Sequence, residues 1–172
     1  MRARSLIALA LLVAPPGAAE VTASTDASFT VTQKVTIAAP AAKVWATLVA
    51  PSLWWNKDHT WSGSAANLSL DPRPGGCWCE RLPNGGGVEH MRVVYAAPDE
   101  MLRLTGGLGP LQAMPASAVM TVTLTPAADG KSTAVAFTYA VAGAPGLGQI
   151  AAPVGGVLGA QVAGLKAAAE RP

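Results

Sequence analysis

The first regular pattern in the chain is an alternation of apolar and polar residues between positions 28 and 37. Every second residue, from 29 to 37, lies on one face, and all of these residues are apolar except Gln33. A period of two predicts a β-strand that buries one face and exposes the other to water. The apolar positions of this strand are Phe29, Val31, Val35 and Ile37.

A short helix is expected directly after this strand. Pro40 suits the first position of a helix and Pro51 stops it, so we predict helical structure over residues 41–50. Val44 and Leu48 lie one turn apart and mark its buried face.

The segment 52–71 is irregular and aromatic. It contains three of the five tryptophans, Trp54, Trp55 and Trp61, and His59 lies between them.

Further strands and a final helix complete the pattern. We predict a strand at 101–105 and a hairpin of strands 118–125 and 132–141 around a turn at 127–130. An apolar stripe at helical spacing then predicts a long C-terminal helix. The residues of this stripe are Val154, Val157, Leu158, Val162 and Leu165.

The last helix also allows a second interpretation. The stretch 144–165 has no charge and contains Gly155 and Gly159 at the spacing of a close-packing motif in membrane helices. Pro153 and several glycines make the stretch only weakly apolar. We therefore favour a helix that lies on a sheet over one that spans a bilayer.

The hairpin around the glycines at 85–87 contains most of the candidate chemistry. Pairing Leu82 with Val88 puts Arg81 opposite Glu89 at its open end, and opposed residues point to the same side. A slip of one residue would exchange the two faces. The inward face would comprise Cys77, Cys79, Met91, Val93, Tyr95, Leu102 and Leu104, and the outward face Trp78, Glu80, His90, Arg92 and Arg103.

Two interpretations of the outward face remain open. We favour a solvated ladder of opposed polar side chains, because nothing on that face would exclude water. The alternative is an acid/base pair formed by Glu80 and His90.

Three interpretations apply to the two cysteines. Residues two apart in a strand have Cα atoms about 6.6 Å apart, near the upper limit for a disulfide. We favour two buried thiols on the apolar face over a disulfide between Cys77 and Cys79. A metal site would also need His59 and has the weakest support.

Charge and the N-terminus narrow the function classes. A basic start, an apolar run and small residues at 17–19 predict a cleaved secretory signal at 1–19, followed by a loose leader at 20–27. Removing Arg2 and Arg4 from the 12 basic residues leaves 10, which equals the number of acidic ones. We therefore expect a periplasmic or secreted domain at 28–170, no nucleic-acid partner and no stable membrane insertion.

The order of elements resembles the helix-grip fold of the START-like, or SRPBCC, superfamily. The segment from Val35 to Trp45 is similar to the first strand and the P-x-x-x-V-W helix of that superfamily, and residues 74–85 resemble its subgroup of polyketide cyclase/dehydrase-like proteins and activators of heat-shock-protein ATPase. The resemblance implies an α+β fold in which a curved antiparallel sheet wraps around a long C-terminal helix, with an apolar cavity between them. It implies no catalytic residue, metal ligand or cofactor.

The resemblance also implies that the aromatic segment 52–71, which follows the first helix, lies over the cavity and so covers one side of the domain. This segment and the inward positions together give the predicted ligand-binding residues. The alternative is a filled core without a cavity, since protein interiors usually pack densely. The predicted residues are Trp54, Trp55, His59, Trp61, Cys79, Arg81, Glu89, Met91, Tyr95, Met120, Phe137 and Tyr139.

Three functions fit the sequence. An exported protein that binds a small lipid-like or aromatic ligand is favoured, because few titratable groups are expected to face inward. A small-molecule enzyme of the cyclase or dehydrase type is the main alternative. A protein-interaction domain of the chaperone-activator kind fits an exported chain less well.

Overall fold

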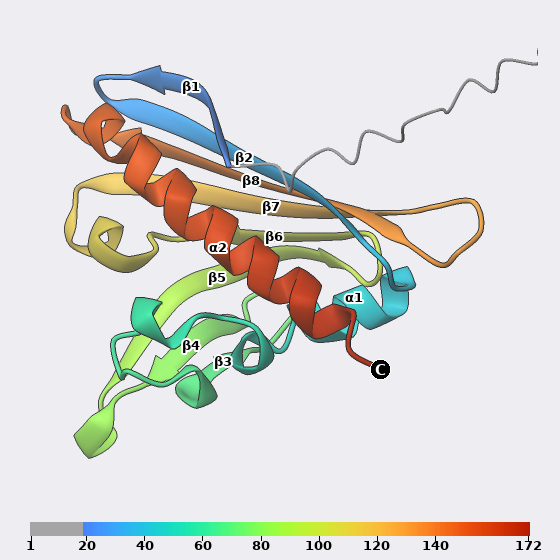
Figure 1. Cartoon of the computed structure of the whole chain (residues 1–172). Coiled ribbons are helices and arrows are strands. Elements are labelled where there is room, and N and C mark those ends of the chain that lie inside the picture. Colours follow the sequence, from blue (N-terminus) through green and yellow to red (C-terminus); the bar gives the residue numbers. More distant parts are fainter. Residues whose placement is uncertain (1–18) are drawn as a thin grey trace, which may run out of the picture.

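A single curved sheet wrapped around a long helix forms the core of the protein (Figure 1). The computed structural model describes residues 19–172, so the secretory signal predicted at 1–19 lies outside the described residues except for Ala19. The strands are β1 (Glu20–Thr25), β2 (Ser28–Ile37), β3 (Leu68–Leu70), β4 (Cys77–Arg81), β5 (Gly87–Ala97), β6 (Met101–Thr105), β7 (Ala116–Pro126) and β8 (Thr133–Gly143).

Two α-helices and six short 3₁₀ turns connect or cover these strands within residues 19–172. The helices are α1 (Ala41–Leu48) and α2 (Ala151–Ala169), and the turns are η1 (Pro51–Leu53), η2 (Lys57–His59), η3 (Ala65–Asn67), η4 (Pro83–Gly85), η5 (Gly109–Ala113) and η6 (Leu147–Ile150). All neighbouring strands pair antiparallel, in the order β1-β2-β8-β7-β6-β5-β4-β3. The predicted α+β helix-grip architecture is confirmed.

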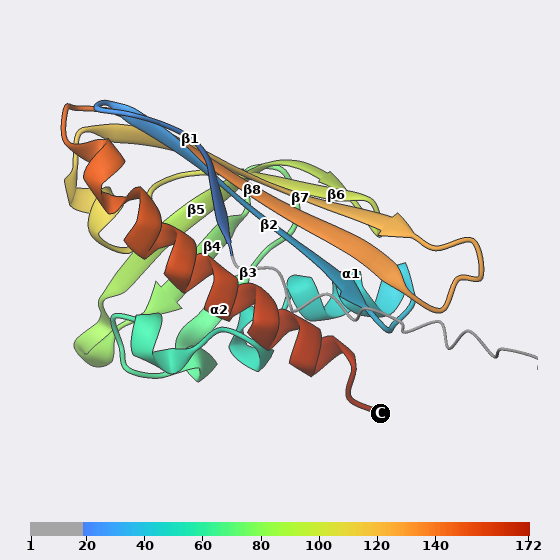
Figure 2. The same cartoon turned by 45° about the horizontal axis from the view of Figure 1, so that its top comes forward.

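Helix α2 runs diagonally across the inner face of the sheet, which curves around it (Figures 1 and 2). Leu158, Val162 and Leu165 are buried, as their helical spacing predicts. The alternation in β2 is also confirmed, because Phe29, Val31 and Ile37 are buried and Val35 is partly buried. The core is therefore the space between this face of the sheet and α2.

The segment Leu147–Ala169 is long and apolar enough to cross a membrane by length and composition. One such helix is weak evidence for a span, because a core helix meets the same criteria. Here α2 packs on β2 and presents its leucines to the sheet.

Two strands were not expected from the pattern. The segment predicted to be a loose leader forms β1, which pairs with β2 from Glu20 opposite Thr32 to Thr25 opposite Ser28. All six residues of β1 are exposed, so the strand has no apolar period to reveal it. Strand β3 is only three residues long and lies at the edge of the sheet.

The predicted register of the β4–β5 hairpin is wrong. Trp78 lies opposite Met91, and Cys79 lies opposite Glu89, so His90 is an extra residue in a β-bulge. This bulge turns two consecutive side chains, His90 and Met91, into the interior. Trp78 and Glu80 consequently face inward as well, where they are 4% and 1% exposed.

A second bulge has the opposite effect further along β5. Val93 pairs with Leu104 and Tyr95 pairs with Arg103, which leaves Val94 as the extra residue. Val94 and Tyr95 are both about half exposed on the outer face, whereas Tyr95 was predicted to face inward. The Arg103 guanidinium carbon lies 5.8 Å from the centre of the Tyr95 ring. The inward placement of Val93, Leu102 and Leu104 is confirmed.

The cysteines form a disulfide rather than two buried thiols. Their Cα atoms are 5.3 Å apart, closer than the spacing expected for a regular strand and within the range that a disulfide can bridge. Both residues are half-buried and alternate with the inward Trp78 and Glu80, so the disulfide lies on the outer side of β4.

The disulfide predicts a specific labelling pattern. Iodoacetamide should label neither cysteine after unfolding in guanidinium without reductant, because no thiolate is available to react. Both cysteines should be labelled once the unfolded protein is reduced, and mass spectrometry would count the labels. Labelling of the unfolded, unreduced protein would restore the free-thiol interpretation.

Helix α2 comes so close to the aromatic segment at Gly164 that adding a side chain there should destabilise the protein. A Cβ atom at Gly164 would lie 2.4 Å from the Trp54 carbonyl oxygen, so Gly164→Ala should lower the free energy of unfolding by about 1–3 kcal/mol. Gly156 is the matched control in the same helix, because a Cβ there meets no atom within 4 Å. Gly156→Ala should stabilise the protein by about 0.5–1 kcal/mol in the same chemical denaturation experiment. Equal effects at the two positions would contradict this packing.

Candidate functional site

A cavity of about 430 Å³ opens at one end of α2, between the aromatic segment and the loop that contains η5. Most of its wall is apolar. His59, Trp61 and Pro153 are exposed, so its mouth lies at the surface. The lining residues are Trp55, Asp58, His59, Thr60, Trp61, His90, Leu108, Gly109, Pro110, Leu111, Met114, Ile150, Pro153, Val154, Val157 and Leu158.

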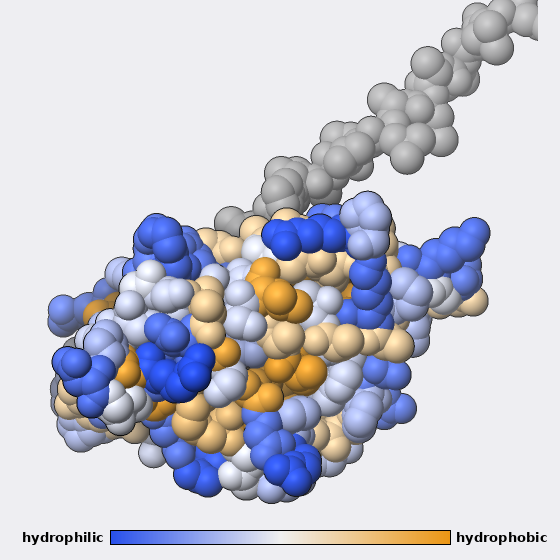
Figure 3. All heavy atoms as spheres, turned by 90° about the horizontal axis from the view of Figure 1, so that it is seen from below, coloured by the Kyte–Doolittle hydropathy of each residue, from blue (hydrophilic) through white to orange (hydrophobic). Residues whose placement is uncertain are grey.

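The molecular surface agrees with this description. The face seen from below has hydrophobic residues in its middle, bordered by hydrophilic ones (Figure 3). Leu53 and Trp61, both from the aromatic segment, remain more than half exposed. Exposed large apolar side chains of this kind are common at binding surfaces.

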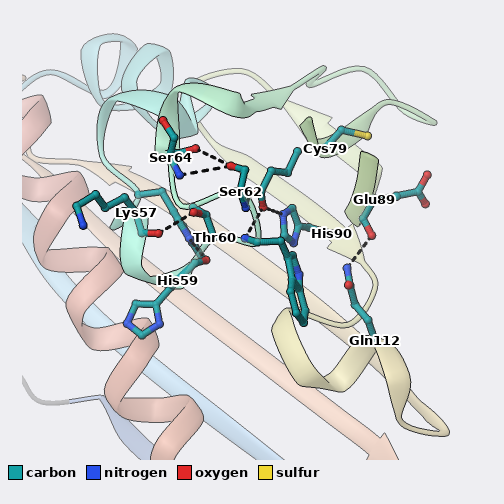
Figure 4. A network of polar contacts seen from close by, with 12 residues as sticks. Lys57, His59, Thr60, Ser62, Ser64, Cys79, Glu89, His90 and Gln112 are labelled. Carbon is teal, nitrogen blue, oxygen red and sulfur yellow. Dashed lines mark hydrogen bonds and ion pairs between the residues drawn. The ribbon is translucent and has the colours of Figure 1, made fainter. Parts of the chain in front are cut away.

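Hydrogen bonds from the sheet hold the η5 side of the cavity. The Tyr139 hydroxyl accepts from the Leu108 amide at 3.0 Å and donates to the Gly106 carbonyl at 3.3 Å. Burial raises the pKa of Tyr139 to about 12, although the bond from Leu108 lowers it. Gln112 Nε2 also donates to the Glu89 carbonyl oxygen at 2.9 Å (Figure 4). These bonds fix the loop that carries much of the apolar wall.

The aromatic segment is anchored to α2 and to itself. The Asn56 amide donates to Oε1 of the buried Gln161 at 2.8 Å, and Trp55 Nε1 donates to the His59 carbonyl at 3.0 Å. Trp55 and Trp78 stack edge to face, with ring centres 4.9 Å apart. The segment predicted to cover one side of the domain therefore forms a fixed wall of the cavity.

The buried side chains of Glu80 and His90 link the aromatic segment to the bulge in β5. The Glu80 carboxylate accepts from the backbone amides of Trp61 and Ser62, and its Oε2 lies 2.9 Å from Nε2 of His90. The Glu80 side chain is completely buried, and that of His90 is 7% exposed. Figure 4 shows His90 beside Ser62 and Thr60, where β5 meets the aromatic segment.

These donors set the charge of Glu80. Burial alone would raise the pKa of its carboxyl group, but hydrogen bonds from Ser62, Trp61 and His90 together outweigh burial and hold that pKa below its ordinary value. Glu80 is therefore an ionised acceptor at neutral pH. It can orient His90, which lines the cavity.

The structure brings together only part of the predicted set of ligand-binding residues. Trp55, His59 and Trp61 line the large cavity. Met120 and Phe137 face inward as predicted, but in the closely packed core, where they border a void of about 10 Å³ together with Trp54. Met91 and Tyr139 are buried in the core as well.

The other four predicted residues lie away from the cavity. Cys79 and Tyr95 face outward because of the two bulges. Arg81 pairs with Gly87 rather than with Glu89. Glu89 is exposed and forms an ion pair with Arg92.

Several lining residues were missed by sequence reasoning. His90 was assigned to the solvated face, and the broken apolar segment around Leu108, Leu111 and Met114 was treated only as a loop. Its density of apolar residues between glycines and prolines was the available signal. Among residues 19–172, no group of three or more His, Cys, Asp or Glu side chains is arranged to hold a metal ion.

The depressed pKa of Glu80 predicts a pH-dependent stability. Its contribution should be fully present above its unfolded pKa of about 4.5 and should be lost as the pH falls through the lower pKa of the folded state. Glu80→Gln should lower the free energy of unfolding by about 1–3 kcal/mol at neutral pH, because glutamine has one acceptor oxygen where the carboxylate has two and its NH2 group would face a backbone donor. The difference from wild type should shrink below pH 4.5 in urea denaturation.

The matched control is Glu100→Gln at an exposed turn position. This variant should match wild type within about 0.5 kcal/mol across the same pH range. A Glu80→Gln difference that does not change with pH would mean that the carboxylate charge has no role in stability.

Comparison with known proteins agrees with this architecture. A family model described as "Polyketide cyclase / dehydrase and lipid transport" matches residues 28–170. An uncharacterized protein from Rhizobium leguminosarum aligns with a TM-score of 0.62 and 21% identity, over 88% of this chain and all of that one. A protein from Mesorhizobium loti gives a TM-score of 0.55 and 21% identity, over 80% of this chain and 94% of its own.

A third structure, CalU16 from Micromonospora echinospora, aligns with a TM-score of 0.51 and 13% identity, over 80% of this chain and 76% of that one. No curated protein sequence matches the chain. At these identities the solved structures establish the fold alone. The family match covers most of the chain, and the chain belongs to the polyketide cyclase/dehydrase and lipid transport family of the START-like superfamily.

Proposed function

We propose that this chain is an exported binding protein that holds a small apolar ligand, lipid-like or aromatic, in the cavity between the aromatic segment, the η5 loop and α2. The observation that carries the proposal is the cavity itself, with its volume of about 430 Å³ and its largely apolar wall. Ligand pockets typically enclose about 300–1,000 Å³ and combine apolar walls with a few placed polar groups.

The rigidity of the wall supports binding. Tyr139 holds the η5 loop, and Gln161 holds the aromatic segment through Asn56. A cavity whose walls are fixed before the ligand arrives loses less conformational entropy on binding.

Export is supported by two independent features. The N-terminal sequence has the layout of a secretory signal. The Cys77–Cys79 disulfide is of a kind that persists in oxidising compartments such as the periplasm.

A small-molecule enzyme is the second candidate, and the Glu80–His90 pair favours it. A histidine oriented by a carboxylate beside an apolar cavity has the arrangement of a general base. The family description includes cyclases and dehydrases beside lipid transport. Turnover of a bound molecule recovered from the exported protein would favour this candidate over simple binding.

Filling the cavity tests the binding proposal. Val157 lines the cavity, so Val157→Trp should lower the affinity for the neutral fluorescent probe N-phenyl-1-naphthylamine by about tenfold or more, because the indole occupies the ligand's volume. Fluorescence titration measures the affinity, and native mass spectrometry of the exported protein shows whether a molecule co-purifies.

The control is Ala160→Trp, on the exposed side of the same helix and outside the cavity. It should leave the affinity for the probe within about threefold of wild type. The proposal is wrong if the wild-type protein binds no probe, or if both variants reduce binding equally.

A further inference from the structure

Most of the cavity wall is apolar, but one ring nitrogen of His90, which lines the cavity, has no hydrogen-bond partner. We infer that the cavity selects apolar molecules that carry a hydroxyl group, and that this hydroxyl donates its proton to Nδ1 of His90. The inference rests on the proposed binding function and specifies the chemical class of the ligand.

Glu80 determines which nitrogen of His90 carries the proton. Oε2 of the Glu80 carboxylate accepts from the Trp61 amide and lies 2.9 Å from His90 Nε2, while Oε1 accepts from the Ser62 amide. A carboxylate surrounded by backbone donors can only accept, so Nε2 must be the protonated nitrogen. In the neutral imidazole, Nδ1 is then a bare acceptor.

Nδ1 of His90 has no hydrogen-bond partner among the described residues. The single hydrogen bond of the ring runs through Nε2. Trp78 and Gln161 carry sealed polar side-chain atoms without a partner, whereas Nδ1 of His90 is not among the sealed atoms of the described residues. His90 lines the large cavity, which leaves its second nitrogen available to a molecule bound there.

The other polar groups of the wall are already bonded or lie at the mouth. The Thr60 hydroxyl donates to the Lys57 carbonyl at 2.6 Å, and Asp58 forms an ion pair with Lys57 at 2.7 Å. His59 is exposed, and Figure 4 shows its ring pointing away from His90, towards α2. His90 is therefore the polar group that a deeply bound ligand would meet.

A ligand hydroxyl placed at Nδ1 of His90 should contribute more binding free energy than a hydroxyl placed elsewhere in the cavity. An acceptor that water can reach loses its hydration when an apolar ligand covers it, which costs free energy, and a donor on the ligand removes that cost. The cavity should therefore discriminate by the presence of a donor, and the apolar wall should accept several skeletons.

Three probes of nearly equal shape test the inference: naphthalene, 2-methoxynaphthalene and 2-naphthol. Wild type should bind 2-naphthol about tenfold more tightly than 2-methoxynaphthalene, which retains the oxygen but lacks the donor. His90→Phe should bring the two affinities together, because the acceptor is removed and an aromatic ring remains. His59→Phe is the matched control and should keep the preference.

The outcomes separate this inference from the binding proposal. Equal affinities of wild type for 2-naphthol and 2-methoxynaphthalene would overturn the inference and leave the cavity proposal intact, even if the His90→Phe variant does not fold. A preference that survives in folded His90→Phe would also overturn it. Tighter binding of 2-naphthoate than of 2-naphthol would mean that Nδ1 is a donor, against the inferred tautomer. If none of the naphthalenes binds wild type, both proposals fail together.

Discussion

The buried Glu80 carboxylate is the constraint around which the functional end of this molecule is organised. A carboxylate removed from water is stable only when donors surround it. Here two donors come from the backbone of the aromatic segment and the third from His90 in β5. The same three bonds therefore keep the charge in place, tie an irregular segment to the sheet and orient a histidine towards the cavity.

A glycine allows the chain after β6 to come close to the backbone of His90. Gly106 has a φ of +138°, and a Cβ atom there would lie 2.7 Å from the His90 carbonyl oxygen. The end of β6 can approach the bulged strand because this position has no side chain. The Gly106 carbonyl also accepts from Tyr139, so one residue links the bulge that presents His90 with the loop that forms the apolar wall.

The sequence predicts the fold well because most of the sheet follows a strict period. The alternation in β2 and the helical stripe in α2 give the correct elements and buried faces, since burial on one side imposes those periods. Strand β5 breaks the rule twice, at His90 in its pairing with β4 and at Val94 in its pairing with β6. A bulge has no signature in the amino-acid composition. The predicted register separates apolar from charged residues, so it places Glu80 outside. Glu80 is buried because backbone amides from another part of the chain donate to it.

The cavity also lies where the chain has irregular rather than periodic structure. Where the strands pack against α1 and the residues that follow it, the side chains leave a void of only about 10 Å³ beside Met120 and Phe137. The large cavity lies where the walls are the aromatic segment and the η5 loop, whose backbones are set by individual hydrogen bonds. Space for a ligand therefore arises where two irregular segments meet α2. Periodicity predicts the α2 side of the wall, Val154, Val157 and Leu158, but not the two irregular sides.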